Sequence, residues 1–219
     1  MPVRTVIADI RAGDPDRGIA ARAAEVLGRG GVLAYPTETF YALGAAAATD
    51  AAIERIYRLK ERDRGKPLSV VVADLTMALA CADSPPALFA DLAAAFWPGP
   101  LTLIVRAGPG FPARMLGPGG SCAMRVPGLP WLRGFLGLFG GPVTATSANL
   151  SGTGEISSAA EVVRLFEGRA DMIVNGGDTA GGRPSTIVDC LADPPCVVRQ
   201  GAVPADALRP YLSAARAAG

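Results

Sequence analysis

The stretch DAAIERIYRLKERDRGKPLSVVVA, residues 50–73, contains a helix pattern, a basic loop and a strand pattern in direct succession. Apolar side chains recur on one face of residues 50–60, which predicts an amphipathic helix. Gly65 loosens the chain after this helix, and Pro67 requires an extended exit. The β-branched, apolar run at 68–73 then predicts a buried strand.

The rest of the chain continues this alternation of helix and strand patterns. Asp14 followed by Pro15 is a typical helix start, and Ser158 is expected to cap a later helix. Strands mixed with helices in this way predict an α/β fold, a twisted, mixed, open sheet flanked by helices. The predicted helices cover residues 14–27, 75–82, 86–96, 128–139, 158–167 and 204–217, and the further strands cover 32–35, 101–106, 122–126, 142–145, 172–174, 186–189 and 197–199.

The length and composition favour a single domain. The chain has 219 residues, of which 50% are hydrophobic, and it contains neither an internal repeat nor a low-complexity linker. We therefore expect one domain over residues 1–219, with a core at about 15–205 and a C-terminal helix at about 204–217.

Several absences narrow the possible chemistry. The chain has no histidine, which excludes a Ser-His-Asp triad, a histidine general base and a histidine-ligated metal. Its four cysteines lack CxxC spacing, so we expect free thiols and no protein metal site. No apolar run approaches the ~20 residues of a membrane span, and no targeting segment is visible, so we expect a cytoplasmic location without a membrane partner.

The charged residues indicate a local cation site. A net charge of +1 is too small for general binding of polyanions, so any such ligand must meet a local cluster. The 21 basic residues are all arginines except Lys60 and Lys66, and both lie in the basic loop. This loop is either a solvated helix end that complements the helix dipole or a cup for phosphate groups.

Three more polar segments lie within or just after predicted strands. Thr37 and Thr39 follow the strand at 32–35, where ligands bind in open α/β sheets, although an ordinary turn has the same composition. Arg125 falls in an otherwise apolar strand, which indicates either a salt bridge or a ligand contact. The segment 141–152 carries hydroxyls, an amide and backbone NH groups that suit phosphate oxygens, or it forms a plain turn.

Taken together, these segments resemble the threonylcarbamoyl-AMP synthase family, which has the YrdC-like fold, in its short single-domain form. The matches cover most of the chain and occur in the family's order. They are Pro-Thr-Glu-Thr ending in Leu-Gly at 36–44, Lys-x-Arg at 60–62 with Lys-Pro-Leu at 66–68, Trp-Pro-Gly-Pro-Leu-Thr at 97–102, Met-Arg-Val-Pro at 124–127, Ser-x-Asn at 147–149, Ser-Thr-Ile-Val-Asp at 185–189, and Arg-x-Gly at 199–201.

The resemblance implies an ATP-consuming nucleotidyltransferase. L-threonine and bicarbonate or CO2 give N-carboxy-threonine, whose carbamate oxygen attacks the α-phosphate of ATP. The products are pyrophosphate and threonylcarbamoyl-AMP, which feeds the threonylcarbamoyl-adenosine modification of tRNA. Further partners would be tRNA and the downstream threonylcarbamoyl-transfer proteins. Such chemistry needs cations and hydrogen-bond donors and no histidine base. Mg²⁺ is expected to be held mainly by the ATP phosphates.

The resemblance also implies roles for individual residues. Lys60 and Arg62 would be the catalytic residues and would hold the ATP phosphates. The other ATP-binding residues would be Ser121, Ser147, Asn149 and Arg199. The threonine-binding residues would be Thr37, Arg125 and Ser185, with Arg125 on the carboxylate. Some family members carry a histidine in the strand after Lys-Pro-Leu, where this chain has only Ser69 and valines, so part of the threonine pocket is expected to differ.

Other functions on the same fold stay open. An RNA-binding or ribosome-associated paralogue without catalysis would lack Lys-x-Arg together with Ser-x-Asn, and this chain has both motifs. A carbamoyl-transfer module of hydrogenase maturation would be expected in a longer chain with zinc-finger-like cysteines. An adenylyltransferase acting on a different amino acid is the third alternative.

Overall fold

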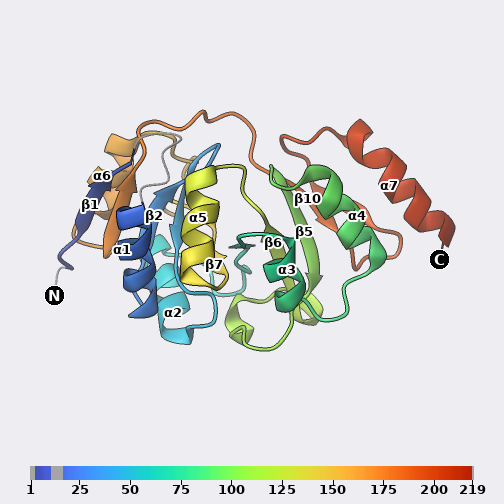
Figure 1. The fold of residues 1–219 in the computed structure, drawn as a ribbon, viewed down its shortest axis with the longest axis horizontal. Coiled ribbons are helices and arrows are strands. Elements are labelled where there is room, and N and C mark those ends of the chain that lie inside the picture. The colour runs from blue at the N-terminus through green and yellow to red at the C-terminus, as the bar shows by residue number, and fades with distance from the viewer. Residues whose placement is uncertain (1–2, 11–16, 219) are drawn as a thin grey trace.

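The computed structural model describes residues 3–10 and 17–218, with side chains described to residue 215. The predicted helix start at Asp14 and Pro15 lies outside these residues. The α/β class with mixed sheets is confirmed, and the structure adds that the strands are divided between two sheets. Figure 1 shows the N-terminus at one end of the long axis and the C-terminal helix at the other.

The first sheet has five strands and mixes parallel with antiparallel pairs. β9 is parallel to both of its neighbours, β1 and β2, whereas β3 is antiparallel to β2 and β8. The strand order is β1 (Val6–Asp9), β9 (Met172–Asn175), β2 (Leu33–Pro36), β3 (Tyr41–Gly44) and β8 (Thr146–Ser147).

The second sheet has six strands and is also mixed. The pairs β10–β5 and β4–β6 are parallel, and the remaining pairs are antiparallel. The strand order is β11 (Cys196–Arg199), β10 (Thr186–Asp189), β5 (Leu101–Arg106), β6 (Ser121–Arg125), β4 (Val70–Val71) and β7 (Val143–Thr144).

Helices cover the outer faces of these sheets. α1 and α5 lie side by side next to the first sheet, and α4 and α7 lie beyond the second (Figure 1). Phe96 of α4 and Tyr211 of α7 meet edge to face, with ring centroids 5.6 Å apart. The helices are α1 (Arg17–Gly28), α2 (Asp50–Lys60), α3 (Leu75–Cys81), α4 (Ala87–Phe96), α5 (Pro130–Phe139), α6 (Ala159–Phe166) and α7 (Ala205–Ala218), with two 3₁₀ turns at Ala113–Met115 and Pro118–Gly120. None of the helices in the described ranges is long and apolar enough to cross a membrane.

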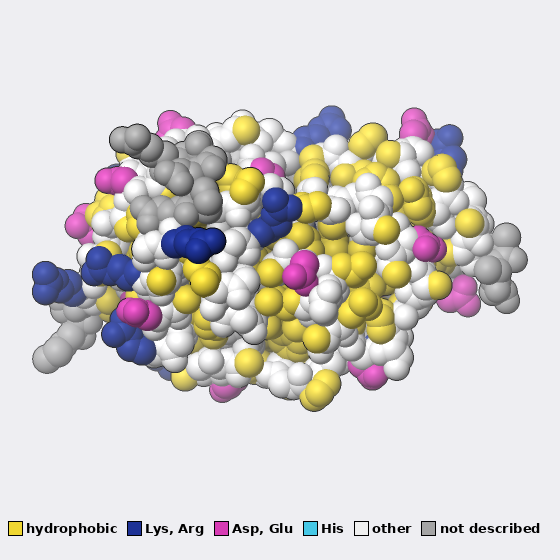
Figure 2. All heavy atoms as spheres, in the orientation of Figure 1, with side chains coloured by type: hydrophobic (Ala, Val, Ile, Leu, Met, Phe, Trp, Pro, Cys, Tyr) yellow, Lys and Arg dark blue, Asp and Glu magenta, His cyan; other side chains and the backbone are white. Residues whose placement is uncertain are grey.

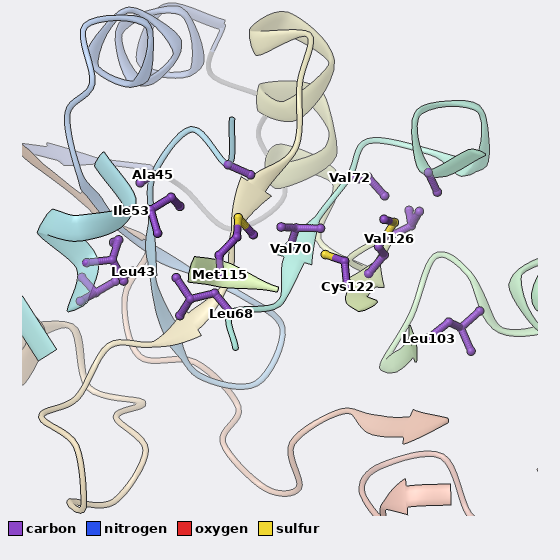
Figure 3. Packing of buried hydrophobic residues seen from close by; sticks show 14 of the residues in the cluster. Leu43, Ala45, Ile53, Leu68, Val70, Val72, Leu103, Met115, Cys122 and Val126 are labelled. Atoms are coloured by element: carbon purple, nitrogen blue, oxygen red, sulfur yellow. The ribbon is translucent and has the colours of Figure 1, made fainter. Parts of the chain in front are cut away.

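The short strand β4 lies where the two sheets meet. In Figure 3, Leu68, Val70 and Met115 fill the space between Leu43 and Ile53 on one side and Cys122 and Val126 on the other. Because these side chains belong to one buried cluster, the predicted helix–loop–strand unit of residues 50–73 joins the two halves of the fold.

The structure corrects several local predictions. The strand predicted at 68–73 keeps only Val70–Val71 as ladder residues. β1, β3 and β8 were not predicted, because they are short and two of them lie within polar segments. Ser158 stands at the N-cap position of α6 but its side chain makes no capping bond. The carboxylate of Asp178 accepts the hydrogen bond from Ala159 N instead, at 3.0 Å.

Candidate functional site

A cleft of about 400 Å³ lies between the two sheets. Its walls come from the turn and strand at 37–42 and from β8 on one side, and from β4, β5, β6, β10 and β11 on the other. The cleft therefore lies where the predicted polar segments of the two halves converge.

Strand alternation explains which side chains of the second sheet face this cleft. Successive residues of a strand point to opposite faces. In β5 and β6, Leu103 and Met124 belong to the buried core, whereas Thr102, Ala123 and Arg125 line the cleft. The arginine in an otherwise apolar strand is thus on the cleft face and not in the core.

The geometry of Arg125 is compatible with both interpretations that the sequence left open. This residue is only 8% exposed, and its Nη1 donates to Glu38 Oε1 at 2.5 Å. Glu38 Oε1 also accepts a hydrogen bond from Gly128 N at 3.3 Å. The salt bridge is therefore present, while Nε and Nη2 of Arg125 have no hydrogen-bond partner within the described part of the chain. This side chain can still donate to an anionic ligand.

Ser185 and Arg199 form a second group on the same sheet face. Arg199 donates from Nε and Nη2 to the main-chain oxygen of Ser185, at 3.1 and 2.9 Å, and from Nη2 to Ser185 Oγ at 3.1 Å. Ser185 Oγ also lies 2.8 Å from Thr102 Oγ1. All three residues line the cleft, so hydroxyl groups and a guanidinium lie together at its wall.

Thr37 organises the turn between β2 and β3. Its hydroxyl donates to the main-chain oxygen of Phe40 at 2.7 Å and accepts from the backbone N–H groups of Thr39 and Phe40 at 3.3 Å. Thr37 and Thr39 both line the cleft. The turn and ligand-site interpretations of this segment are therefore compatible.

Lys60 is buried behind the cleft wall and is 1% exposed. Its ammonium donates to the main-chain oxygen of Ser147, to the main-chain oxygen of Asn149 at 2.8 Å and to Asn149 Oδ1 at 3.1 Å. Burial lowers the pKa of Lys60 to about 8, with Arg62 adding repulsion and Glu155 opposing the shift. Because an ammonium has three N–H donors, all of them are directed to the Ser147–Asn149 turn.

Ser147 and Asn149 complete this arrangement. Ser147 Oγ donates to Asn149 Oδ1 at 2.5 Å, and Asn149 Nδ2 donates to the main-chain oxygen of Thr153 at 2.6 Å. Ser147 lines the cleft, and Asn149 is buried beside it at 6% exposure. Lys60 and the Ser-x-Asn motif thus form one hydrogen-bonded unit.

Arg62 differs from Lys60 because its side chain lines the cleft. Its Nη2 donates to the main-chain oxygen of Pro67 at 2.9 Å, and its Nε lies 3.4 Å from the main-chain oxygen of Lys66. The hydroxyl of Tyr57 holds the same loop, at 2.8 Å from Lys66 O and 3.0 Å from Arg114 O. The guanidinium therefore stands on a fixed loop, and Nη1 has no partner among the residues the structure describes.

The cleft has an excess of positive charge. Arg62, Arg125 and Arg199 line it, and Glu155 is the one carboxylate among its described lining residues. Burial lowers the pKa of Arg62 and of Arg199, but an arginine stays protonated in proteins. Such a cleft favours an anionic ligand with carboxylate or phosphate groups.

The predicted site residues are largely brought together. Thr37, Arg62, Arg125, Ser147, Ser185 and Arg199 line the cleft, while Lys60 and Asn149 lie directly behind it. Ser121 does not line it, because it lies at the start of β6, opposite Arg106. Thr102 and Glu155 also line the cleft but were not predicted as site residues. Thr102 is the last residue of the Trp-Pro-Gly-Pro-Leu-Thr motif, and this motif could have identified it as a site residue. Glu155 lies in a polar loop that matches none of the family motifs.

Comparisons with known proteins agree with this arrangement. The family model of the Sua5, YciO and YrdC proteins, described as telomere recombination, matches residues 25–201. The threonylcarbamoyl-AMP synthase of Pyrococcus abyssi (strain GE5 / Orsay) is 34% identical over 194 residues, which cover 89% of this chain and 57% of that protein. The threonylcarbamoyl-AMP synthase of Bacillus subtilis (strain 168) is 36% identical over 184 residues, which cover 84% and 53%.

A solved structure shows the same fold. P. abyssi Sua5 complexed with L-threonine matches with a TM-score of 0.87 and 31% identity, over 94% of this chain and 60% of that one. The chain spans only about half the length of the curated relatives it matches, 57% and 53%. With most of its length matched by the family model, this chain belongs to the Sua5/YciO/YrdC family.

Proposed function

We propose that this protein is an L-threonylcarbamoyladenylate synthase, which makes threonylcarbamoyl-AMP and pyrophosphate from L-threonine, bicarbonate or CO2, and ATP. The observation that carries the proposal is the cleft between the two sheets, where three arginines lie beside the unit formed by Lys60, Ser147 and Asn149. Related proteins named threonylcarbamoyl-AMP synthase support the same function.

The charge of the cleft suits the reaction. A carbamate oxygen of N-carboxy-threonine forms a new bond to the α-phosphorus of ATP, and the bond from that phosphorus to the pyrophosphate oxygen breaks. Both reactants are anionic, so catalysis depends on positioning and on neutralising charge. Arg62 would donate to the phosphate groups, while Arg125 would donate to the threonine carboxylate. Ser185 and Thr102 would position the amino acid, and Arg199, which donates to Ser185, would reach the nucleotide.

Lys60 would act in this reaction by holding the Ser147–Asn149 turn. All three of its N–H groups are directed to oxygens of that turn. The turn would then present the Ser147 hydroxyl and its backbone to the nucleotide. We assign direct contact with the phosphates to Arg62 and the positioning role to Lys60.

The residues of the cleft also fit a nucleotide accompanied by Mg²⁺. No group of three or more Asp, Glu or Cys side chains that could hold a metal occurs in the described ranges. Mg²⁺ prefers to keep phosphate oxygens and waters as ligands, with one or two carboxylates from the protein. The single carboxylate of Glu155 matches that requirement. Mg²⁺ would neutralise charge on the phosphates when bound.

The RNA-binding alternative has weaker support. On the face of the molecule drawn in Figure 2, Lys and Arg side chains gather near α1, while apolar and uncharged atoms dominate the centre. The net charge is only +1, which gives little nonspecific attraction to RNA. An adenylyltransferase for a different amino acid would use the same phosphate contacts, so the substrate test must separate it.

The proposed function is tested by incubating the protein with ATP, Mg²⁺, bicarbonate and each amino acid in turn, and measuring pyrophosphate. We expect pyrophosphate release that depends on threonine and on bicarbonate together. Release that needs an amino acid but not bicarbonate would indicate ordinary aminoacyl adenylation. RNA binding without any pyrophosphate release would support the noncatalytic alternative.

A further inference from the structure

Glu155 is out of place in a cleft suited to anions. It lines the cleft together with Arg62, Arg125 and Arg199. It takes part in none of the ion pairs between described residues. A carboxylate that faces an anionic ligand is repulsive unless a cation lies between them.

The backbone around Glu155 is held at several points. The main-chain oxygen of the next residue, the buried Ile156, accepts a hydrogen bond from Tyr41 N at 2.9 Å. On the other side, Ser151 N donates to Lys60 O at 3.0 Å, and Asn149 Nδ2 donates to Thr153 O at 2.6 Å. The exposed carboxylate therefore projects from a segment that is tied to the Lys60–Asn149 unit.

The charge of Glu155 acts on the end of the cleft that we assign to phosphates. Burial lowers the pKa of both Lys60 and Arg199, which lie on different elements, and the negative charge of Glu155 opposes that lowering at each of them. A nucleotide bound against Arg62 and Arg199 would bring its phosphates into the same region. Carboxylate and phosphate oxygens are the ligands that a hard divalent cation combines.

We propose that Glu155 is the protein's carboxylate ligand for the divalent cation that binds together with the nucleotide phosphates. This inference rests on the proposed function, because it needs a nucleotide in the cleft. It explains why an acidic side chain occurs among three arginines. It also predicts that Glu155 favours the nucleotide–metal complex over the nucleotide alone.

The test is a calorimetric titration of the full chain with a nonhydrolysable ATP analogue, in excess Mg²⁺ and again in EDTA. For the wild type we expect Mg²⁺ to tighten nucleotide binding by about 10-fold, within the usual range of coupling between two ligands. In Glu155→Gln, binding in EDTA should be equal or tighter, because a negative charge is gone, while the Mg²⁺ enhancement should largely disappear. Glu155→Asp should retain part of it.

Glu161→Gln is the matched control, because Glu161 is an exposed carboxylate on α6 that pairs with Arg164 outside the cleft. This variant should show the wild-type Mg²⁺ enhancement. The same enhancement in Glu155→Gln as in the wild type would overturn this inference alone. A wild type that binds the analogue neither with nor without Mg²⁺ would overturn the proposed function, and this inference with it.

Discussion

The two walls of the cleft hold their cations in different ways. At the wall formed by the basic loop after α2, here called the loop wall, Lys60 is buried behind the surface and its three donors end on oxygens of the Ser147–Asn149 turn. At the wall formed by the second sheet, here called the sheet wall, Arg125 and Arg199 lie on the surface of the sheet. Arg125 donates to Glu38, and Arg199 donates to the main-chain oxygen of Ser185. A compact ammonium suits oxygens that surround it in different directions, and a planar guanidinium suits a flat surface with ligands on it. This difference explains why one of only two lysines in an arginine-rich chain lies at position 60.

The largest effect is expected from Arg62, because it is the cation of the loop wall that faces the cleft. Arg62→Ala should lower turnover by about 10² to 10³-fold, the range for loss of one preorganised electrostatic contact in a transition state. Steady-state pyrophosphate release measures this. Arg64→Ala is the matched control, since Arg64 is exposed and paired with Glu54 outside the cleft. Equal losses in the two variants would contradict the assignment.

Lys60 should lower activity by a different route. Lys60→Met removes the donors that hold the Ser147–Asn149 turn, so turnover should fall by about 10² as the turn loosens, a loss comparable to misplacing a reacting group. Hydrogen exchange at residues 147–153 should accelerate in this variant and stay at the wild-type rate in Arg62→Ala. Unchanged exchange in Lys60→Met would show that Lys60 does not hold the turn.

At the sheet wall, the effects should be smaller and coupled. Ser185→Ala and Thr102→Val should each raise the KM for threonine by about 5-fold, because a neutral hydrogen bond contributes about 1 kcal/mol. Since the two hydroxyls lie 2.8 Å apart, the double variant should lose less than the product of the two effects. Fully multiplicative losses would indicate two independent contacts.

The buried lysine also predicts opposite pH dependences for activity and stability. The pKa of Lys60 is lowered from 10.5 to about 8. Above pH 8 the ammonium loses a donor, so turnover should fall several-fold by pH 9.5. A lowered pKa means that the unfolded chain binds more protons between pH 8 and 10.5, so this residue's contribution to the free energy of unfolding increases over that window. The comparison is with Lys60→Met, which should lack both trends.

The smallest effect is expected from Tyr57, which holds the loop that carries Arg62. Tyr57→Phe removes the hydroxyl that lies 2.8 Å from Lys66 O, and one such bond contributes about 1 kcal/mol. Turnover should fall a few-fold, and the KM for ATP should rise. Because Tyr57 acts through Arg62, adding Tyr57→Phe to Arg62→Ala should cause no further loss of turnover. A change in stability alone, with unchanged kinetics, would leave Tyr57 without a positioning role.

The sequence predicted the strongly patterned elements best. The bounds of α2, β5 and β10 were predicted to the residue, because apolar periodicity and flanking turn residues mark them. β3 and β8 were missed because they are short and lie within polar segments, and their pairing joins residues that are distant in the chain. The division into two sheets was not predictable either, since β4 contributes only two ladder residues.

The chemistry of the site was predictable in part. Most of the polar residues at the cleft were identified from their motifs, with Thr102 and Glu155 as exceptions, but their roles depend on contacts between distant segments. Lys60 belongs to a charge run that is typical of a solvated helix end, and its partners lie 87 and 89 positions further along the chain. The pairing of Arg125 with Glu38, which are 87 positions apart, was likewise invisible to local patterns.

The central claim is that the cleft joins a carbamate of threonine to the α-phosphate of ATP. The most direct measurement incubates the protein with ATP, Mg²⁺, L-threonine and ¹³C-labelled bicarbonate and examines the AMP adduct by mass spectrometry. The account predicts a threonylcarbamoyl-AMP adduct that carries the ¹³C label and disappears in Arg62→Ala. An unlabelled threonyl-AMP adduct, or no adduct from the wild type, would contradict it.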